Sequence, residues 1–268
     1  MRPWIFTIGG YTLHAYPFFL VLAFVGASLL GLHGATRLRN LRVSPLICVW
    51  MLLGSLLGAR LASLVSEGQY AAVWRAVLIW EPGMIFYGGV AGGAVAGWVY
   101  ARANRLPLVP LAAAAAPAAA LGEAIGRIGC LFNGCCYGSV CSWAVAIVFP
   151  RYSPAYYHHV SLGLIDATAT QSLPVYPSQI FMSIALFAAT PWLYRLLKRS
   201  TKDGFVCCAY LIVQGMLRFA METMRDDMPR ILGSMTASQA VSVGFVLVGC
   251  VVGGVLVLRI KVGFVEKA

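Results

Sequence analysis

The sequence predicts an all-α integral membrane protein, and three observations lead to that prediction: its composition, its long apolar runs and the position of its basic residues. Of its 268 residues, 60% are hydrophobic and only 11% are charged. A soluble globular domain averages about 25% charged residues, and a chain of this length tolerates so little charge only inside a membrane. The composition therefore excludes a disordered chain, a coiled coil and a disulfide-stapled secreted domain.

The apolar residues gather in runs of the length that crosses a bilayer, which is roughly 20 helical residues. About seven such runs are separated by loop signals: 12–34, 45–65, 83–101, 107–125, 176–197, 204–222 and 236–258. The fourth carries the weakest signal, because it is rich in alanine and contains Pro110 and Pro117, and it could be re-entrant. Residues 1–11 do not resemble a removable signal peptide. We expect residues 1–268 to form a single membrane-embedded domain.

The basic residues predict the orientation of the chain. The net charge is +11, and the loops at one end of the runs hold Arg37, Arg39, Arg42, Arg102, Arg105, Arg195, Lys198, Arg199, Lys202, Arg259, Lys261 and Lys267. Cytoplasmic loops collect Lys and Arg, so the N-terminus is expected outside and the C-terminus inside. The long connection 126–175 then forms a small head on the non-cytoplasmic side. Because the positive charge follows the membrane topology, we expect no nucleic-acid partner.

A first candidate site lies at the outer end of the fourth run, where residues 126–138 read GRIGCLFNGCCYG. Arg127 offers a planar fork of donors for a phosphate or carboxylate. The glycines, Gly138 among them, permit backbone conformations and close approaches that other residues resist. Asn133 could bind lipid oxygens or shape the turn. The alternative interpretation is a tight loop whose arginine reaches to the membrane interface.

A second candidate site closes the sixth run. Arg218, Glu222 and Arg225 are spaced i, i+4 and i+7, so they are expected to share one helix face. Two cations around one anion leave a net positive charge that attracts a further anion. The alternative is a structural ladder of ion pairs at a helix end.

A third candidate lies at the start of the third run, in Tyr87-Gly88-Gly89. Small residues at this spacing are typical of close helix packing, which is the simpler interpretation of the glycines. Tyr87 differs, because a phenol at membrane depth needs a hydrogen-bond partner and could serve as an acid or base beside a cation.

Together these motifs resemble the prolipoprotein diacylglyceryl transferase family over nearly the full chain. The resemblance rests on Leu13-His14-Ala15-Tyr16, Phe86-Tyr87-Gly88-Gly89, the 126–138 segment, Tyr176-Pro177-Ser178-Gln179, the Arg218, Glu222 and Arg225 set, and Thr236-Ala237-Ser238-Gln239. The 126–138 segment and the arginine–glutamate set are specific in combination.

The resemblance implies a bacterial inner-membrane enzyme whose active site faces outward. It would transfer the diacylglyceryl group of phosphatidylglycerol to the thiol of a lipobox cysteine in an exported prolipoprotein, without a metal or other cofactor. Arg127 and Arg218 would hold the phosphate, and Glu222 and Arg225 would orient them. Tyr16 would lie near the lipid head group, and Asn133, Gly138, Gly88 and Gly89 would complete the substrate site.

The sequence departs from the family pattern at four positions. Tyr87 stands where the family has a histidine proposed as proton acceptor, and a phenol has a reference pKa near 10 against about 6.5 for histidine. Cys130 replaces an asparagine, and Cys135 and Met182 replace acids. These changes concern the acceptor more than the lipid donor. Two alternatives therefore stay open: another thiol or alcohol acceptor, or a lipid-binding or transport protein without transfer chemistry.

Four cysteines, Cys130, Cys135, Cys136 and Cys141, lie on the outer side by this topology. A disulfide from Cys141 to one of the other three fits an oxidising compartment. Zinc is disfavoured, because the spacing differs from that of a zinc knuckle. A third interpretation makes Cys135 a reactive thiol of low pKa near Arg127.

The histidines give weaker signals. His158 and His159 are interpreted as surface residues, because neighbouring side chains point in different directions. His14 is the better candidate to replace the missing base, although an interfacial histidine without a catalytic task is the simpler interpretation.

Overall fold

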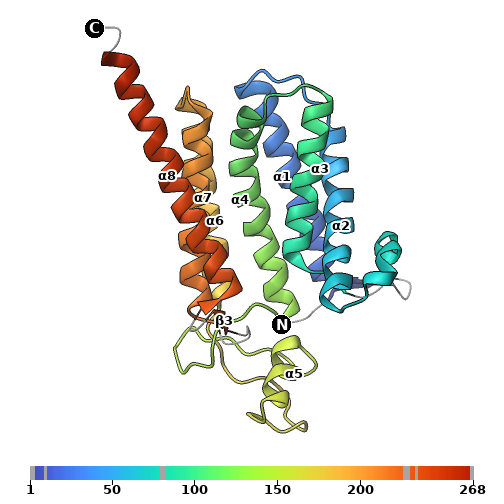
Figure 1. Cartoon of the computed structure of the whole chain (residues 1–268). Helices are drawn as coiled ribbons and strands as arrows, with labels where there is room; N and C mark the ends of the chain where they lie inside the picture. The colour runs from blue at the N-terminus through green and yellow to red at the C-terminus, as the bar shows by residue number, and fades with distance from the viewer. Residues whose placement is uncertain (1–3, 9–10, 79–82, 226–229, 233–234, 266–268) are drawn as a thin grey trace. The chain divides into compact units, whose positions relative to one another are not determined.

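The computed structural model describes residues 4–8, 11–78, 83–225, 230–232 and 235–265, and α-helices dominate these ranges (Figure 1). The α-helices are α1 (Ala15–His33), α2 (Leu46–Ser66), α3 (Phe86–Ala103), α4 (Leu108–Asn133), α5 (Pro154–Ser161), α6 (Ser178–Arg199), α7 (Asp203–Glu222) and α8 (Ala237–Val265). A π-helical turn, Gly34–Leu38, follows α1, and a 3-10 helix, Tyr70–Val77, follows α2. Two antiparallel hairpins pair β1 (Trp4–Ile8) with β2 (Tyr11–His14) and β3 (Arg230–Leu232) with β4 (Met235–Thr236).

The long helices confirm an all-α, multi-pass membrane protein. Within the described residues, six helical segments are long and apolar enough to cross a membrane: Ala15–Leu38, Leu46–Ser66, Leu108–Asn133, Ser178–Arg199, Asp203–Glu222 and Ala237–Leu258. The third predicted run is also helical, as α3. It is not among the six, because its many glycines and its terminal Arg102 make it less apolar than the others.

The fourth run forms one continuous helix rather than a re-entrant segment. α4 has 26 residues, includes Pro117 and reaches Asn133, whereas the sequence placed its end at residue 125. Alanine is the strongest helix former, which favours this continuity. The Ser183 hydroxyl of α6 donates a 2.9 Å hydrogen bond to the Ala124 carbonyl, tying α4 to its neighbour. As a consequence, Arg127 and Cys130 lie on a helix and not in the predicted head.

The chain divides into two compact units, residues 32–112 and residues 1–31 with 113–268. In the smaller unit, α2 and α3 pack through glycines. A Cβ atom added at Gly92 would lie 2.9 Å from the Gly58 Cα atom, and one added at Gly58 would lie 2.8 Å from the Gly92 Cα atom. Gly88 and Gly89 also face α2, where their backbones approach Gly58 and Ser55. Small residues let the two backbones approach closely. In lipid, where no hydrophobic force drives helices together, such close van der Waals packing holds them.

The larger unit contains the core between α4, α6 and α7. Its buried residues are Ala120, Ala124, Met182, Leu186 and Leu193, and Ala209, Tyr210, Leu217 and Met221 pack against them. α8 lies close against α7, since a Cβ atom at Gly215 would be 2.7 Å from the Ser242 carbonyl oxygen. These contacts fix α4 and α7, the two helices that carry the charged residues described below.

A small head between α4 and α6 has a core of its own. Tyr137, Phe149, Ala155 and Val175 form that core, and Ile147 and Val175 exchange backbone hydrogen bonds of 3.0 and 2.9 Å. Ser153 caps the N-terminus of α5, where its hydroxyl accepts a hydrogen bond from the Tyr156 amide. Figure 1 shows α5 at the same end of α4 and α6 as β3, while α8 ends at the opposite end.

The glycine packing of α2 and α3 can be tested by one methyl group. We expect Gly92→Ala to destabilise the protein by ~1–3 kcal/mol, because a side chain there overpacks the interface. Thermal unfolding in detergent measures the effect. The matched control is Gly254→Ala in α8, since a Cβ atom at Gly254 meets nothing within 4 Å. An unchanged midpoint for Gly92→Ala would contradict the close packing.

Candidate functional site

One carboxylate joins the two arginines that the sequence singled out. Glu123 and Arg127 lie one turn apart on α4, and their Oε1 and Nη2 atoms are 2.8 Å apart. The same oxygen lies 3.5 Å from Nη1 of Arg218 on α7. The side chains of all three residues are 12–17% exposed, so little water screens the charges. Arg127 and Arg218 therefore share one carboxylate partner, and their joint part in phosphate binding stays a prediction.

Further polar groups hold this arrangement from two other points. Gln214 lies one turn before Arg218 on α7 and donates its side-chain amide to Oε2 of Glu123. Arg218 donates its Nε–H to the Ser238 hydroxyl of α8 at 2.9 Å. Both oxygens of Glu123 therefore have partners, which is what a carboxylate removed from water requires.

A second ion pair lies at the C-terminal end of α7. Oε2 of Glu222 lies 3.5 Å from Nη1 of Arg225, and both side chains are buried. The Thr236 hydroxyl donates to Oε1 of Glu222 at 3.2 Å. The sequence placed Arg225 on the same helix face as Arg218, but α7 ends at Glu222 and Arg225 follows in a turn. Its amide donates to the Glu222 carbonyl, and this turn directs the guanidinium back to the carboxylate.

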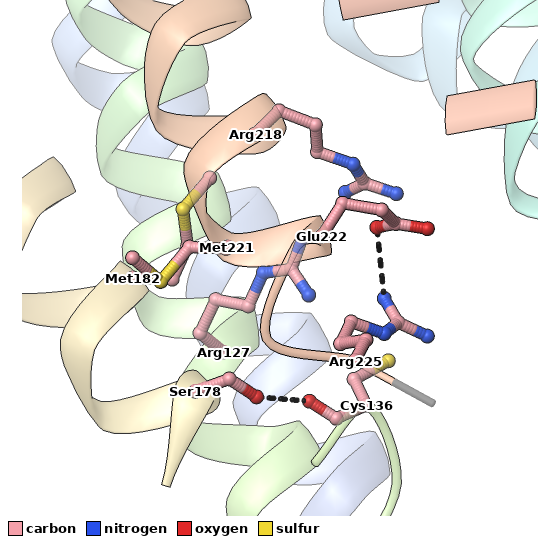
Figure 2. A pocket seen from close by; sticks show the side chains of 8 residues that line it. All are labelled: Arg127, Cys136, Ser178, Met182, Arg218, Met221, Glu222 and Arg225. Carbon is pink, nitrogen blue, oxygen red and sulfur yellow. Dashed lines mark hydrogen bonds and ion pairs between the residues drawn. The ribbon is translucent and has the colours of Figure 1, made fainter. Parts of the chain in front are cut away.

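These charged residues surround a pocket (Figure 2). Its lining consists of Arg127, Cys136, Ser178, Met182, Arg218, Met221, Glu222 and Arg225. The pocket is much smaller than one that encloses a whole drug-sized ligand, because the lining side chains fill most of its space. The pocket therefore suits a polar head group better than the acyl chains of a lipid.

The charge of the pocket favours an anion. Three arginines and the two carboxylates of Glu123 and Glu222 leave one net positive charge. Arginine presents planar donors that match the oxygens of a phosphate. A cationic site among membrane-spanning helices is costly unless an anionic partner occupies it. The arrangement can therefore bind a phosphate group and stabilise negative charge that develops on it.

Three of the four outer cysteines lie together beside this pocket. The sulfur atoms of Cys130, Cys135 and Cys136 are all within 4.8 Å of one another. All eight cysteines fall within the described residues, and all are free thiols, so the disulfide considered for Cys141 is not formed. The resemblance implied no metal, but these three sulfurs are close enough to share one metal ion.

Cys135 and Cys136 have different surroundings, which shift the pKa values of their thiols in opposite directions. Hydrogen bonds from Cys130 and Cys135 to its sulfur, aided by Arg225 and Arg127, hold the pKa of Cys136 well below its usual range. For Cys135, a hydrogen bond from Cys130 lowers the pKa, but the hydrogen bond with Cys136 and burial outweigh it and raise the pKa overall. Cys136 is thus the cysteine that lines the pocket with the arginines, and a catalytic part for Cys135 stays a prediction. Only the fold shows which cysteine faces the arginines.

The other predicted residues of the larger unit lie around the same cluster. Tyr16 on α1 is within electrostatic range of Arg127 and of the three clustered cysteines. Asn133 ends α4 and hydrogen-bonds to the Cys135 sulfur. Gly138 has a packing task, because a Cβ atom there would lie 2.6 Å from the Tyr176 Cβ atom and 2.9 Å from the Met224 carbonyl oxygen.

Tyr87, Gly88 and Gly89 belong to the smaller unit. Tyr87 is the second residue of α3 and is 42% exposed. The helix N-terminus adds a favourable environment for an anion at this position. Gly88 and Gly89 pack against α2, as expected from the spacing of small residues in this run.

The two histidines of the head differ in burial, and the interpretation as a surface residue is wrong for His159. His159 is buried, and its Nδ1 atom accepts from the Leu173 amide at 3.1 Å. His158 hydrogen-bonds through Nδ1 to the Tyr137 hydroxyl at 2.7 Å. The head folds its chain over α5 and buries the His159 ring, whereas His158 stays partly exposed. His14, the other candidate base, is exposed at the end of β2.

The chain is similar to known proteins over nearly its whole length. The family model for prolipoprotein diacylglyceryl transferase matches residues 3–255. This chain belongs to that family. Two similar proteins named phosphatidylglycerol–prolipoprotein diacylglyceryl transferase come from Synechococcus elongatus, at 30% identity over 90% of this chain and 83% of the relative, and from Gloeobacter violaceus, at 28% over 93% and 90%. The relative from Clostridium perfringens, named transferase 2, is 29% identical over 95% of this chain and 93% of its own length.

Two residues in and beside the pocket differ from what the sequence indicated. Met182, where the resemblance leads one to expect an acid, is 1% exposed in the α4–α6–α7 core. Glu123 is the residue that sequence reasoning missed, together with its partner Gln214. The available signal was the i, i+4 spacing of Glu123 and Arg127, which is typical of a helical ion pair.

Glu123 can be tested by removing its charge alone. We expect Glu123→Gln to destabilise the protein by ~1–3 kcal/mol, because two poorly hydrated arginines lose their shared anion. Thermal unfolding in detergent measures the loss. Asp166→Asn removes the same charge from an exposed loop of the head and serves as the control. Equal midpoints for both variants would show that Glu123 does not hold the arginines.

Proposed function

We propose that this chain transfers the diacylglyceryl group of phosphatidylglycerol to the thiol of a lipobox cysteine in an exported prolipoprotein. A thioether forms, and glycerol phosphate leaves. One observation carries the proposal: the arginines of α4 and α7 meet beside a small pocket that has a net positive charge. The names of the relatives indicate phosphatidylglycerol as the lipid donor and a prolipoprotein as the acceptor.

In this proposal Arg127 and Arg218 bind the phosphate. The phosphodiester of the lipid has one negative charge, and the departing phosphate monoester carries close to two. Groups that stabilise the added charge act mainly in the transition state, and such interactions raise the rate of the chemical step. Glu123 and Glu222 hold the arginines, and Tyr16, Asn133 and Gly138 border the site from the side of the cysteines.

The lipid and the acceptor need different routes to this site. We place the pocket at the outer face of the bacterial inner membrane, because the basic loops at the other ends of the helices predict the cytoplasm. The acyl chains stay in the bilayer while the head group enters the pocket. The acceptor peptide then approaches across the head formed by residues 134–177.

The main test follows both products of the reaction. Purified protein is incubated with phosphatidylglycerol and a lipobox peptide, and mass spectrometry detects the diacylglyceryl group on the peptide and the released glycerol phosphate. We expect both products, and a rate about 10²–10³-fold lower for Arg127→Ala, since one donor to the developing charge is lost.

The outcomes of this test separate the alternatives. Arg151→Ala is the matched control, because Arg151 lies in the head on an exposed turn and bonds to the Ala167 carbonyl. Glycerol phosphate without modified peptide would indicate another acceptor. Neither product from folded, lipid-binding protein would indicate a lipid-binding or transport protein.

Tyr87 can be tested separately for a part in proton transfer. We expect Tyr87→Phe to lower transfer about 10²-fold, because phenylalanine cannot carry a proton. Binding of phosphatidylglycerol should stay unchanged, since the arginines remain. Single-turnover transfer and equilibrium lipid binding are the two measurements. Full transfer by this variant would remove Tyr87 from the mechanism.

A further inference from the structure

The chain reverses its direction beside the pocket and brings three sulfur atoms together. Cys130 lies in the last turn of α4, and Gly134 follows the helix with a positive φ of 74°. This turn folds Cys135 and Cys136 back onto Cys130, so that all three sulfurs lie within 4.8 Å of one another. The spacing of these cysteines in the sequence argued against zinc, but the turn brings their sulfurs close enough to share one ion.

The backbone around the cluster is held at several points. The Cys135 amide donates to the Cys130 carbonyl at 3.2 Å. From the start of α6, Gln179 and Ser178 donate to the carbonyls of Cys135 and Cys136 at 2.8 and 2.7 Å. Cys136 has φ of +59°, a conformation that residues with a Cβ atom adopt only when their surroundings impose it. The three sulfurs are thus positioned before any ligand arrives.

We propose that Cys130, Cys135 and Cys136 bind one zinc ion whose fourth position takes the thiolate of the acceptor cysteine, an inference that rests on the proposed function. Catalytic zinc has three protein ligands and one open position. A Zn–S distance of about 2.3 Å places the sulfurs of a tetrahedral site about 3.8 Å apart. The cluster reaches this geometry by small rotations of its side chains.

The neighbouring charges fit such a complex. Three thiolates and Zn²⁺ have a net charge of −1, and an added acceptor thiolate makes it −2. Cys136 lines the same pocket as Arg127 and Arg225, and Figure 2 shows its side chain next to Arg225. These cations offset the negative charge of the complex. In the proposed function Arg127 also binds the phosphate, which brings the acceptor sulfur and the lipid head group to one place.

The chemical step balances without an oxidant or reductant. The acceptor thiol binds zinc and releases its proton through a weak proton acceptor to water, because coordination to the metal deprotonates a thiol. An electron pair of the sulfur then forms the bond to C3 of the glycerol. The bond from that carbon to the phosphate oxygen breaks, and its electron pair leaves with glycerol phosphate. A weak proton acceptor suffices for this step, which accounts for a family member that has Tyr87 in place of histidine.

Metal content and spectroscopy test the site independently of activity. We expect the full-length protein in lipid nanodiscs to contain about one zinc per chain. The Cys136→Ser variant should contain at least ~10-fold less. Cys141→Ser is the matched control, because Cys141 lies in the same head but, among the described residues, outside the cluster.

After exchange of zinc for Co²⁺, a lipobox peptide should increase the sulfur-to-cobalt absorption by about one third, as a fourth thiolate joins three. A peptide with serine in place of cysteine should not.

Four results would overturn the inference. They are a protein without bound metal, a disulfide between two of the three cysteines, a cobalt spectrum that the peptide does not change, and full transfer after removal of zinc by a chelator. In the last case transfer itself is present, so the proposed function stands while the zinc site fails. If zinc binds and the peptide joins it but no transfer occurs, the zinc site is supported and the proposed function fails.

Discussion

The larger unit of this protein depends on the carboxylate of Glu123. It lies within 3.5 Å of guanidinium nitrogens from two different helices, Arg127 on α4 and Arg218 on α7. An arginine without a partner inside a membrane protein is strongly unfavourable. A single carboxylate between two arginines reduces this cost but does not cancel the positive charge. The remaining charge gives the pocket its affinity for an anion, so the interaction that stabilises the helices also creates the site.

The head makes the second contribution, because it fixes the outer wall of that site. Gly138 lets the chain pass between Tyr176 and Met224, and Ser178 and Gln179 hold the carbonyls of Cys136 and Cys135. The start of α6 thereby supports the cysteine cluster as well as the pocket. The arginines of the pocket and the three clustered sulfurs thus come from one junction of α4, α6 and α7.

Much of the fold could be predicted from the sequence, since apolar runs of fixed length report membrane helices directly. Arg127, Arg218, Glu222 and Arg225 could also be predicted, because a charged residue in an apolar run is costly and usually marks a functional site. The continuity of α4 through Pro117 could not, since packing with α6 decides it. The partners of the charges were equally hidden. Glu123 forms an ion pair with Arg218, which lies 95 residues away in the chain. The turn after Glu222 directs the guanidinium of Arg225 to the Glu222 carboxylate.

The sequence by itself determined that the chain is a membrane protein, that its third helix packs through glycines, and that arginines lie within its apolar runs. These properties follow from composition and local spacing, which need no knowledge of distant contacts. Only the tertiary structure decided that Cys130, Cys135 and Cys136 form a cluster, that Cys136 and not Cys135 faces the arginines, and that His159 is buried. The physical reason is that burial, shared ion pairs and sulfur–sulfur distances depend on how the chain turns at Gly134 and on which helices meet there.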